Sequence, residues 1–125
     1  MKKLLALALL SLPVSAAADY LDVIQMKLKD GCSVDQLVSI TKDFNEQWGK
    51  SHGYKGEIAA PLQSDDMAST YFVGRTASAE AFGKAWDSWR DDLSDAKSLP
   101  AKLNARFEKC SETKGRRGYD VYSSK

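Results

Sequence analysis

A strand, a turn and the start of a helix follow one another in residues 20–40, YLDVIQMKLKDGCSVDQLVSI. Within 20–29, apolar and polar residues alternate, which predicts a strand with one face on a core. One face of this strand would carry the apolar residues Ile24, Met26 and Leu28. The opposite face would also carry apolar residues, Leu21 and Val23. We therefore expect both faces of this strand to be partly covered, and Asp30-Gly31 to end it as a turn.

The next segment has the signature of a capped helix. Ser33 is followed three residues later by Gln36, the spacing of a capping box. Apolar residues then recur at helical spacing as far as Trp48, and Gly49 is a suitable stop. The sequence predicts a helix over 34–48.

The remainder of the chain continues with strands and helices. Strands are predicted at 54–62, where Pro61 indicates an edge or a bulge, and at 69–75. A helix capped by Ser78 follows, and Pro100 opens a shorter second piece. We interpret 111–118 as a polar, basic loop and 119–122 as a short final strand.

The predicted order is therefore β-α-β-β-α-β, which is the ferredoxin-like arrangement of the α+β class. It consists of a four-stranded antiparallel sheet with two helices on one face. Right-handed crossovers place the first and third strands in the centre, with the fourth beside the first. No linker or repeat interrupts residues 19–125, so they are expected to form one domain.

Residues 1–18 have the three-part pattern of a secretory signal peptide. Lys2 and Lys3 precede the apolar run 4–12, and small residues follow up to Ala18. Cleavage is expected after Ala18 or Ala16. The run is shorter than the roughly 20 residues of a spanning helix. The pattern predicts a periplasmic or secreted protein with no membrane segment after signal removal.

Two cysteines, Cys32 and Cys110, are the only ones in the chain. An oxidising compartment favours a disulfide between them. In the predicted topology both lie at the same end of the sheet, on neighbouring strands, so the bond is geometrically feasible. The alternative is two free, buried thiols.

Composition excludes several classes of site. The net charge of +1 gives no support for nucleic-acid binding. One histidine and two cysteines are too few for the usual structural zinc sites, and Asp65-Asp66 is interpreted as a turn. We expect no metal and no cofactor, and no hydrolase, phosphate-loop or zinc-protease motif is present.

Three short segments carry a resemblance to a known group of proteins. They are YFVGR at 71–75, AF at 81–82 and WDSW at 86–89. In this pattern the chain resembles the dimeric α+β barrel superfamily, which includes antibiotic-biosynthesis-monooxygenase-like domains. The resemblance implies a homodimer formed through the sheet. Haem-degrading members use a histidine on a helix, whereas the single histidine here, His52, is predicted in a loop.

Four side chains are candidates for ligand binding, namely His52, Arg75, Trp86 and Trp89. Each also has a plain structural interpretation, as a solvated loop histidine, an exposed strand-end charge or helix–sheet core. Trp48 and Phe82 are further aromatic residues on the same kind of helical stripe. The basic residues Lys114, Arg116 and Arg117 are interpreted as solvated loop or strand-edge charges. The sequence assigns no catalytic residues, which stay unknown at this point.

Three functions remain open. The first is an exported, non-enzymatic protein that binds a small apolar or aromatic ligand, because aromatic residues are abundant and acid–base pairs are absent. The second is a cofactor-independent monooxygenase-like enzyme acting on a small aromatic substrate, which requires His52, Arg75 and Trp86 to meet in one pocket. The third is a protein-interaction module, which requires a flat exposed apolar patch.

Overall fold

The computed structural model describes residues 18–124 and contains one antiparallel sheet of four strands in the order β2-β3-β1-β4. Residues 1–17 of the predicted signal peptide lie outside the described residues. No helix within 18–124 is long and apolar enough to cross a bilayer. The elements are β1 (Asp19–Leu28), α1 (Val34–Gln47), the 3₁₀ helix η1 (Gly49–His52), β2 (Lys55–Ala59), β3 (Ser69–Thr76), α2 (Ala79–Leu93), α3 (Leu99–Cys110) and β4 (Ser111–Val121).

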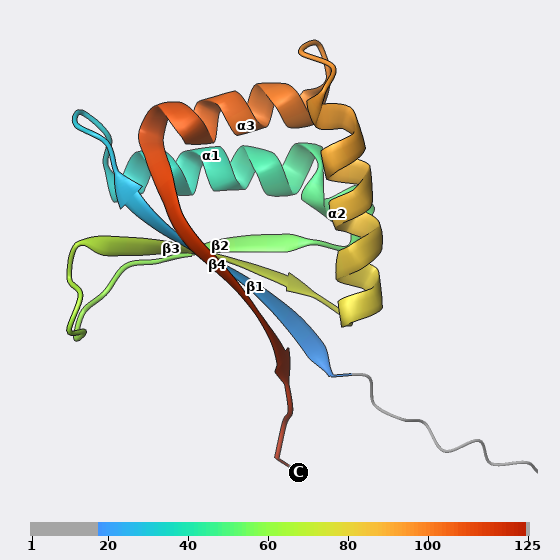
Figure 1. Cartoon of the computed structure of the whole chain (residues 1–125), viewed down its shortest axis with the longest axis horizontal. Coiled ribbons are helices and arrows are strands. Elements are labelled where there is room, and N and C mark those ends of the chain that lie inside the picture. Colours follow the sequence, from blue (N-terminus) through green and yellow to red (C-terminus); the bar gives the residue numbers. More distant parts are fainter. Residues whose placement is uncertain (1–17, 125) are drawn as a thin grey trace, which may run out of the picture.

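The predicted ferredoxin-like fold is confirmed. β1 and β3 are the central strands, and β4 pairs antiparallel with β1. All helices lie on one face of the sheet, with α1 and α3 side by side and α2 turned across one end (Figure 1). We call the covered side the inner face, where β1 places Asp22, Ile24 and Met26, and the other side the open face, where it places Leu21 and Val23.

A serine caps each of the α-helices described within residues 18–124. The capping box predicted at Ser33 is present, because Gln36 N donates to Ser33 Oγ at 3.2 Å and Ser33 N donates to Gln36 Oε1 at 2.7 Å. Ser78 caps α2, as predicted. Ser98 caps α3, and Pro100 lies in the first turn of that helix, where its missing N–H costs nothing.

The end of the chain differs from the prediction. β4 starts at Ser111, directly after α3, and pairs with β1 along its length, with a bulge between Gln25 and Met26. The polar segment 111–118 is therefore strand and not loop. β2 is shorter than predicted and ends at Ala59, before Pro61, which cannot donate a ladder hydrogen bond. His52 lies in η1 and not in an irregular loop.

The predicted cross-link is confirmed, so the alternative of two free thiols is wrong. Cys32 and Cys110 form a disulfide with their Cα atoms 5.2 Å apart. It ties the turn after β1 to the end of α3. A backbone bond from Lys29 N to Cys110 O, at 2.9 Å, holds the same junction.

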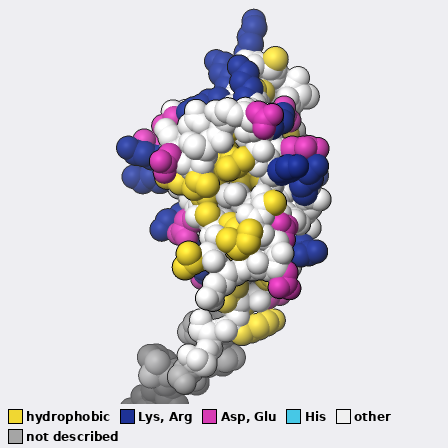
Figure 2. Space-filling model, turned by 90° about the vertical axis from the view of Figure 1, so that its left-hand side faces the viewer, with side chains coloured by type: hydrophobic (Ala, Val, Ile, Leu, Met, Phe, Trp, Pro, Cys, Tyr) yellow, Lys and Arg dark blue, Asp and Glu magenta, His cyan; other side chains and the backbone are white. Residues whose placement is uncertain are grey.

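The surface carries mixed charge with scattered apolar groups. On the side shown in Figure 2, hydrophobic side chains lie in several separate groups, with charged side chains of both signs along the margins. The most exposed large apolar residues are Leu62 and Tyr122, at 90% and 83%. Leu62 lies in the connection between β2 and β3, and Tyr122 follows β4.

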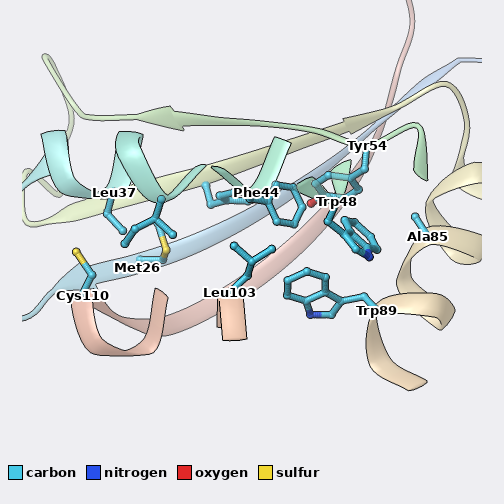
Figure 3. Packing of buried hydrophobic residues seen from close by; sticks show 11 residues of the cluster. Met26, Leu37, Phe44, Trp48, Tyr54, Ala85, Trp89, Leu103 and Cys110 are labelled. Atoms are coloured by element: carbon cyan, nitrogen blue, oxygen red, sulfur yellow. The ribbon is translucent and has the colours of Figure 1, made fainter. Parts of the chain in front are cut away.

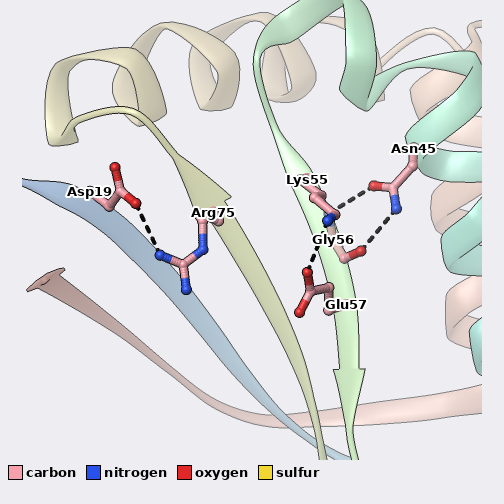
Figure 4. A network of polar contacts seen from close by, with 6 residues as sticks. All are labelled: Asp19, Asn45, Lys55, Gly56, Glu57 and Arg75. Atoms are coloured by element: carbon pink, nitrogen blue, oxygen red, sulfur yellow. Dashed lines mark hydrogen bonds and ion pairs between the residues drawn. The ribbon is translucent and has the colours of Figure 1, made fainter.

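The core between the helices and the inner face is largely aromatic (Figure 3). The ring of Phe44, on α1, lies at its centre, with five other aromatic ring centroids within 6.2 Å. Towards the disulfide, the smaller side chains of Leu37 and Leu103 complete the packing. Asn45, also on α1, bonds both backbone groups of Gly56, at 2.7 and 2.9 Å, and so fixes α1 to β2 (Figure 4).

Candidate functional site

A pocket of about 470 Å³ lies between the inner face of the sheet and the helices, and reaches β4. This volume falls in the range of about 300–1,000 Å³ that is usual for small-molecule sites. Its walls are mainly aromatic. The aromatic lining residues are Phe44, Trp48, Tyr54, Phe72, Phe82, Trp86, Trp89 and Phe107.

Helical periodicity explains most of this aromatic lining. Phe82, Trp86 and Trp89 are spaced by four and three residues on α2, so they share one face of that helix. Trp48 and Trp89 are core residues, only 5% and 9% exposed. Phe82 and Trp86 are half-buried. The inner part of the wall is thus packed core, and the outer part remains accessible.

One charged group lies at the edge of this aromatic space, deep in the sheet. Asp22 is 1% exposed and points to the inner face of β1. Its Oδ2 accepts from the Tyr54 hydroxyl at 2.8 Å and from Arg116 Nη2 at 2.5 Å, and its Oδ1 accepts from Arg116 Nε at 2.8 Å. We call these three residues the Asp22 cluster. Three donors compensate the burial of the carboxylate, which would otherwise be costly.

Two glycines make room for the cluster. Asp22 is paired across the sheet with Gly74 on β3 and with Gly118 on β4. A Cβ atom at Gly74 would collide with the Tyr54 hydroxyl, and one at Gly118 would collide with the Tyr20 hydroxyl. Glycine inside a strand often marks such a close approach. The Tyr54 ring therefore lies over β3 and the Tyr20 ring over β4, on either side of Asp22.

The protonation states in the cluster follow from burial and charge. Burial raises the pKa of Tyr54 far above its usual value, and the negative charge of Asp22 and its hydrogen bond raise it further. Tyr54 is thus a neutral donor. Burial lowers the pKa of Arg116, but the hydrogen bond and the attraction of Asp22 outweigh this and leave that pKa raised. The ion pair has no net charge.

Arg116 connects the cluster to the aromatic wall. Its guanidinium carbon lies 4.0 Å from the Trp86 ring centroid and 5.8 Å from that of Phe82, within the distance of cation–π attraction. The Arg116 side chain is 34% exposed, whereas that of Asp22 is 2% exposed. Arg116 therefore reaches from the buried carboxylate to the accessible part of the pocket.

The structure brings two of the four candidate residues together. Trp86 and Trp89 both line the pocket. His52 stacks on Trp48 with centroids 4.1 Å apart, and its ring nitrogens contact the Trp48 carbonyl and the Ser88 hydroxyl. It is not among the residues that line the pocket.

Arg75 lies away from the pocket as well. It points to the open face near the end of β3, and its Nη1 pairs with Asp19 Oδ2 at 3.1 Å (Figure 4). Both side chains are half exposed. His52, Arg75 and Trp86 therefore do not converge on one pocket.

Sequence interpretation missed the Asp22 cluster. Arg116 was expected to be solvated in a loop or at a strand edge, but the structure pairs it with a buried carboxylate, and that expectation is wrong. The burial of Asp22 could have been predicted, because the alternation in β1 places Asp22 on the same side as the core residues Ile24 and Met26. For Tyr54, the sequence indicates only a position at the start of a predicted strand.

The acidic pair was interpreted correctly as a turn. Asp66 Oδ1 accepts from the backbone of Ala68 and Ser69 at 2.9 and 3.2 Å. Hydrogen bonding by Ser69 and by these backbone groups lowers the pKa of Asp66. Over residues 18–124 no group of three or more histidine, cysteine, aspartate or glutamate side chains could hold a metal ion.

Comparison with known proteins yields resemblance in fold. No protein-family model matches the chain, and no curated protein matches it in sequence. SnoaB, a cofactor-independent oxygenase from Streptomyces nogalater, is similar with a TM-score of 0.55 and 10% identity, covering 86% of this chain and 97% of that one. A Bacteroides thetaiotaomicron protein of unknown function, described as a possible oxidoreductase, is similar with a TM-score of 0.53 and 10% identity, covering 85% of this chain and 100% of that one. The chain therefore resembles these two proteins in fold.

Proposed function

We propose that this chain is an exported protein that binds a small aromatic molecule in the pocket between sheet and helices, without catalysing a reaction. The observation that carries the proposal is an accessible space of about 470 Å³ lined by eight aromatic residues. Such residues suit an aromatic guest, because stacked and edge-on ring contacts add to apolar burial. The N-terminal pattern of residues 1–18 and the disulfide support export, since disulfides persist in oxidising compartments.

A monooxygenase-like enzyme is the alternative suggested by the fold, and SnoaB is a cofactor-independent oxygenase. Fold alone does not carry a reaction from one protein to another. The enzyme requires His52, Arg75 and Trp86 in one pocket, but Arg75 lies on the open face and His52 is bonded to the Trp48 carbonyl.

A protein-interaction module would need a flat, exposed apolar patch. The apolar side chains in Figure 2 lie in separate groups and give no support to such a patch on that side. Binding is therefore the proposal we retain.

Trp86 supplies the test of binding. In calorimetric titration of the purified protein with a naphthyl methyl ketone, Trp86→Leu is expected to weaken the affinity about tenfold. The reason is that a ring contact contributes about 0.5–1.5 kcal/mol beyond its buried area. Tyr122→Leu is the control, because this exposed tyrosine follows β4 outside the pocket. Equal affinity of Trp86→Leu and wild type, or no heat for the wild type, would overturn the proposal.

The open face supports a homodimer. None of the helices formed by residues 18–124 covers it (Figure 1), and Val23 lies directly opposite Val73 at its centre. Leu21 and Tyr71 extend this apolar strip, and all four side chains are only half-buried. We propose that a second copy packs on this face.

Light scattering checks the dimer. We expect twice the chain mass for the wild type and a monomer for Val73→Lys, because an unpaired charge would be buried in the interface. Val38→Lys is the matched control, since Val38 is exposed on α1, on the other side of the sheet, and should leave the dimer intact. A monomeric wild type would rule out this part of the proposal.

A further inference from the structure

The polar end of the pocket indicates which aromatic molecules enter it. We propose that the pocket selects neutral aromatic molecules that carry a hydrogen-bond acceptor, such as an aryl ketone, over the matching carboxylates. The acceptor would bind Arg116, whose charge is cancelled by Asp22. This inference rests on the proposed function, because it specifies the ligand of the same pocket.

The bonds to Asp22 leave some of the hydrogen-bond donors of Arg116 unused. A guanidinium has five N–H groups, and the hydrogen bonds of Arg116 within residues 18–124 are those of Nε and Nη2 to Asp22. The two N–H groups of Nη1 and the second N–H of Nη2 have no partner in this part of the chain. Arg116 lines the pocket and its side chain is 34% exposed. These groups are therefore available to an acceptor on a bound molecule.

The donors are also held in place. Two hydrogen bonds of 2.8 and 2.5 Å fix the guanidinium against Asp22, and Trp86 lies 4.0 Å from its centre. A rigid donor loses little conformational entropy when it binds. A ring packed against Trp86 would carry its acceptor close to the guanidinium, so one molecule can use both the aromatic wall and the donors.

Charge explains the preference for neutral ligands. The Asp22 carboxylate neutralises Arg116 at contact distance, so the pair exerts little net attraction on an anion. Lys29 also lines the pocket, but so do two further carboxylates, Glu108 and Glu112. A carboxylate ligand would lose its hydration without a compensating positive charge. A ketone accepts a hydrogen bond at a much smaller desolvation cost.

The test compares three probes of similar shape by calorimetry at neutral pH: a naphthyl methyl ketone, the matching naphthoate and the matching ethylnaphthalene. For the wild type we expect the ketone to bind about tenfold more tightly than either of the others. The reason is the hydrogen bond to a charged donor, which the other two probes lack or make only after a larger desolvation cost. A tenfold difference in affinity corresponds to about 1.4 kcal/mol. The wild-type comparison alone decides the inference, whether or not a variant folds.

Asp22→Asn adds a sharper test, because it keeps the side-chain size and removes the charge that cancels Arg116. In this variant the order is expected to reverse, with naphthoate bound more tightly than the ketone. If the folded variant keeps the wild-type order, the role of Asp22 is overturned. If wild type binds naphthoate or ethylnaphthalene as tightly as the ketone, the inference fails while the proposed function stands. If no probe binds, the proposed function fails as well.

Discussion

Removal of the disulfide is expected to lower the free energy of unfolding by about 4.5 kcal/mol, the largest effect of any single change considered. Cys32 and Cys110 are 78 residues apart in sequence, and their bond closes a loop over most of the folded chain. Without it, the unfolded state gains the entropy of an open chain. A domain of this size has about 5–15 kcal/mol in total, so the loss approaches the limit of stability.

Urea unfolding of Cys32→Ala/Cys110→Ala against the oxidised wild type measures this loss. Thiol titration of the denatured but unreduced wild type provides the control, and we expect no reactive thiol. Two reactive thiols in that material, or equal unfolding midpoints for the two proteins, would contradict the cross-link as a stabilising element.

Replacement of Arg116 by leucine is expected to cost about 3 kcal/mol. The loss of one partner from a buried ion pair costs about 3–5 kcal/mol, because the other charge stays buried without compensation. Here the remaining charge is Asp22, which is 1% exposed. Among the described residues, Tyr54 would be its only remaining side-chain donor. We expect the lower end of that range because Arg116 itself is 34% exposed and partly screened.

Arg90→Leu is the matched control for this prediction. Arg90 is exposed on α2, where it pairs with Asp87 at the surface, so the change should stay within about 0.5 kcal/mol. Asp22→Asn/Arg116→Leu should lose less than Arg116→Leu alone, because no unpaired charge remains. Equal losses for Arg116→Leu and Arg90→Leu in urea unfolding would show that the buried pair contributes nothing.

Much of the fold could be predicted because its signals are local. The alternation around Ile24 and Met26 predicts β1, and the capping box at Ser33 predicts α1. Most of β4, residues 111–118, escaped prediction because these residues are polar, charged or glycine. Strand preference depends largely on neighbouring strands, and β4 is stabilised by pairing with β1, which lies far away in sequence.

The candidate site was predictable only in its aromatic part. The spacing of Phe82, Trp86 and Trp89 predicts one shared helical face, and the structure places that face on the pocket. The Asp22–Arg116 pair joins residues 94 positions apart, and no local pattern reports such a contact. Arg75 shares its phase with Tyr71 and Val73 on β3. Because side chains alternate along a strand, Arg75 was expected to lie on the face opposite to Phe72, and hence outside the core.

The pocket itself is tested most directly by a crystal structure of the protein with the naphthyl methyl ketone. We expect electron density for the ring beside Trp86, and the ketone oxygen within hydrogen-bond distance of an Arg116 Nη atom, with the Asp22–Arg116 pair intact. A ligand bound on the open face, or a pocket filled by the protein's own side chains, would contradict the assignment of this space as a binding site.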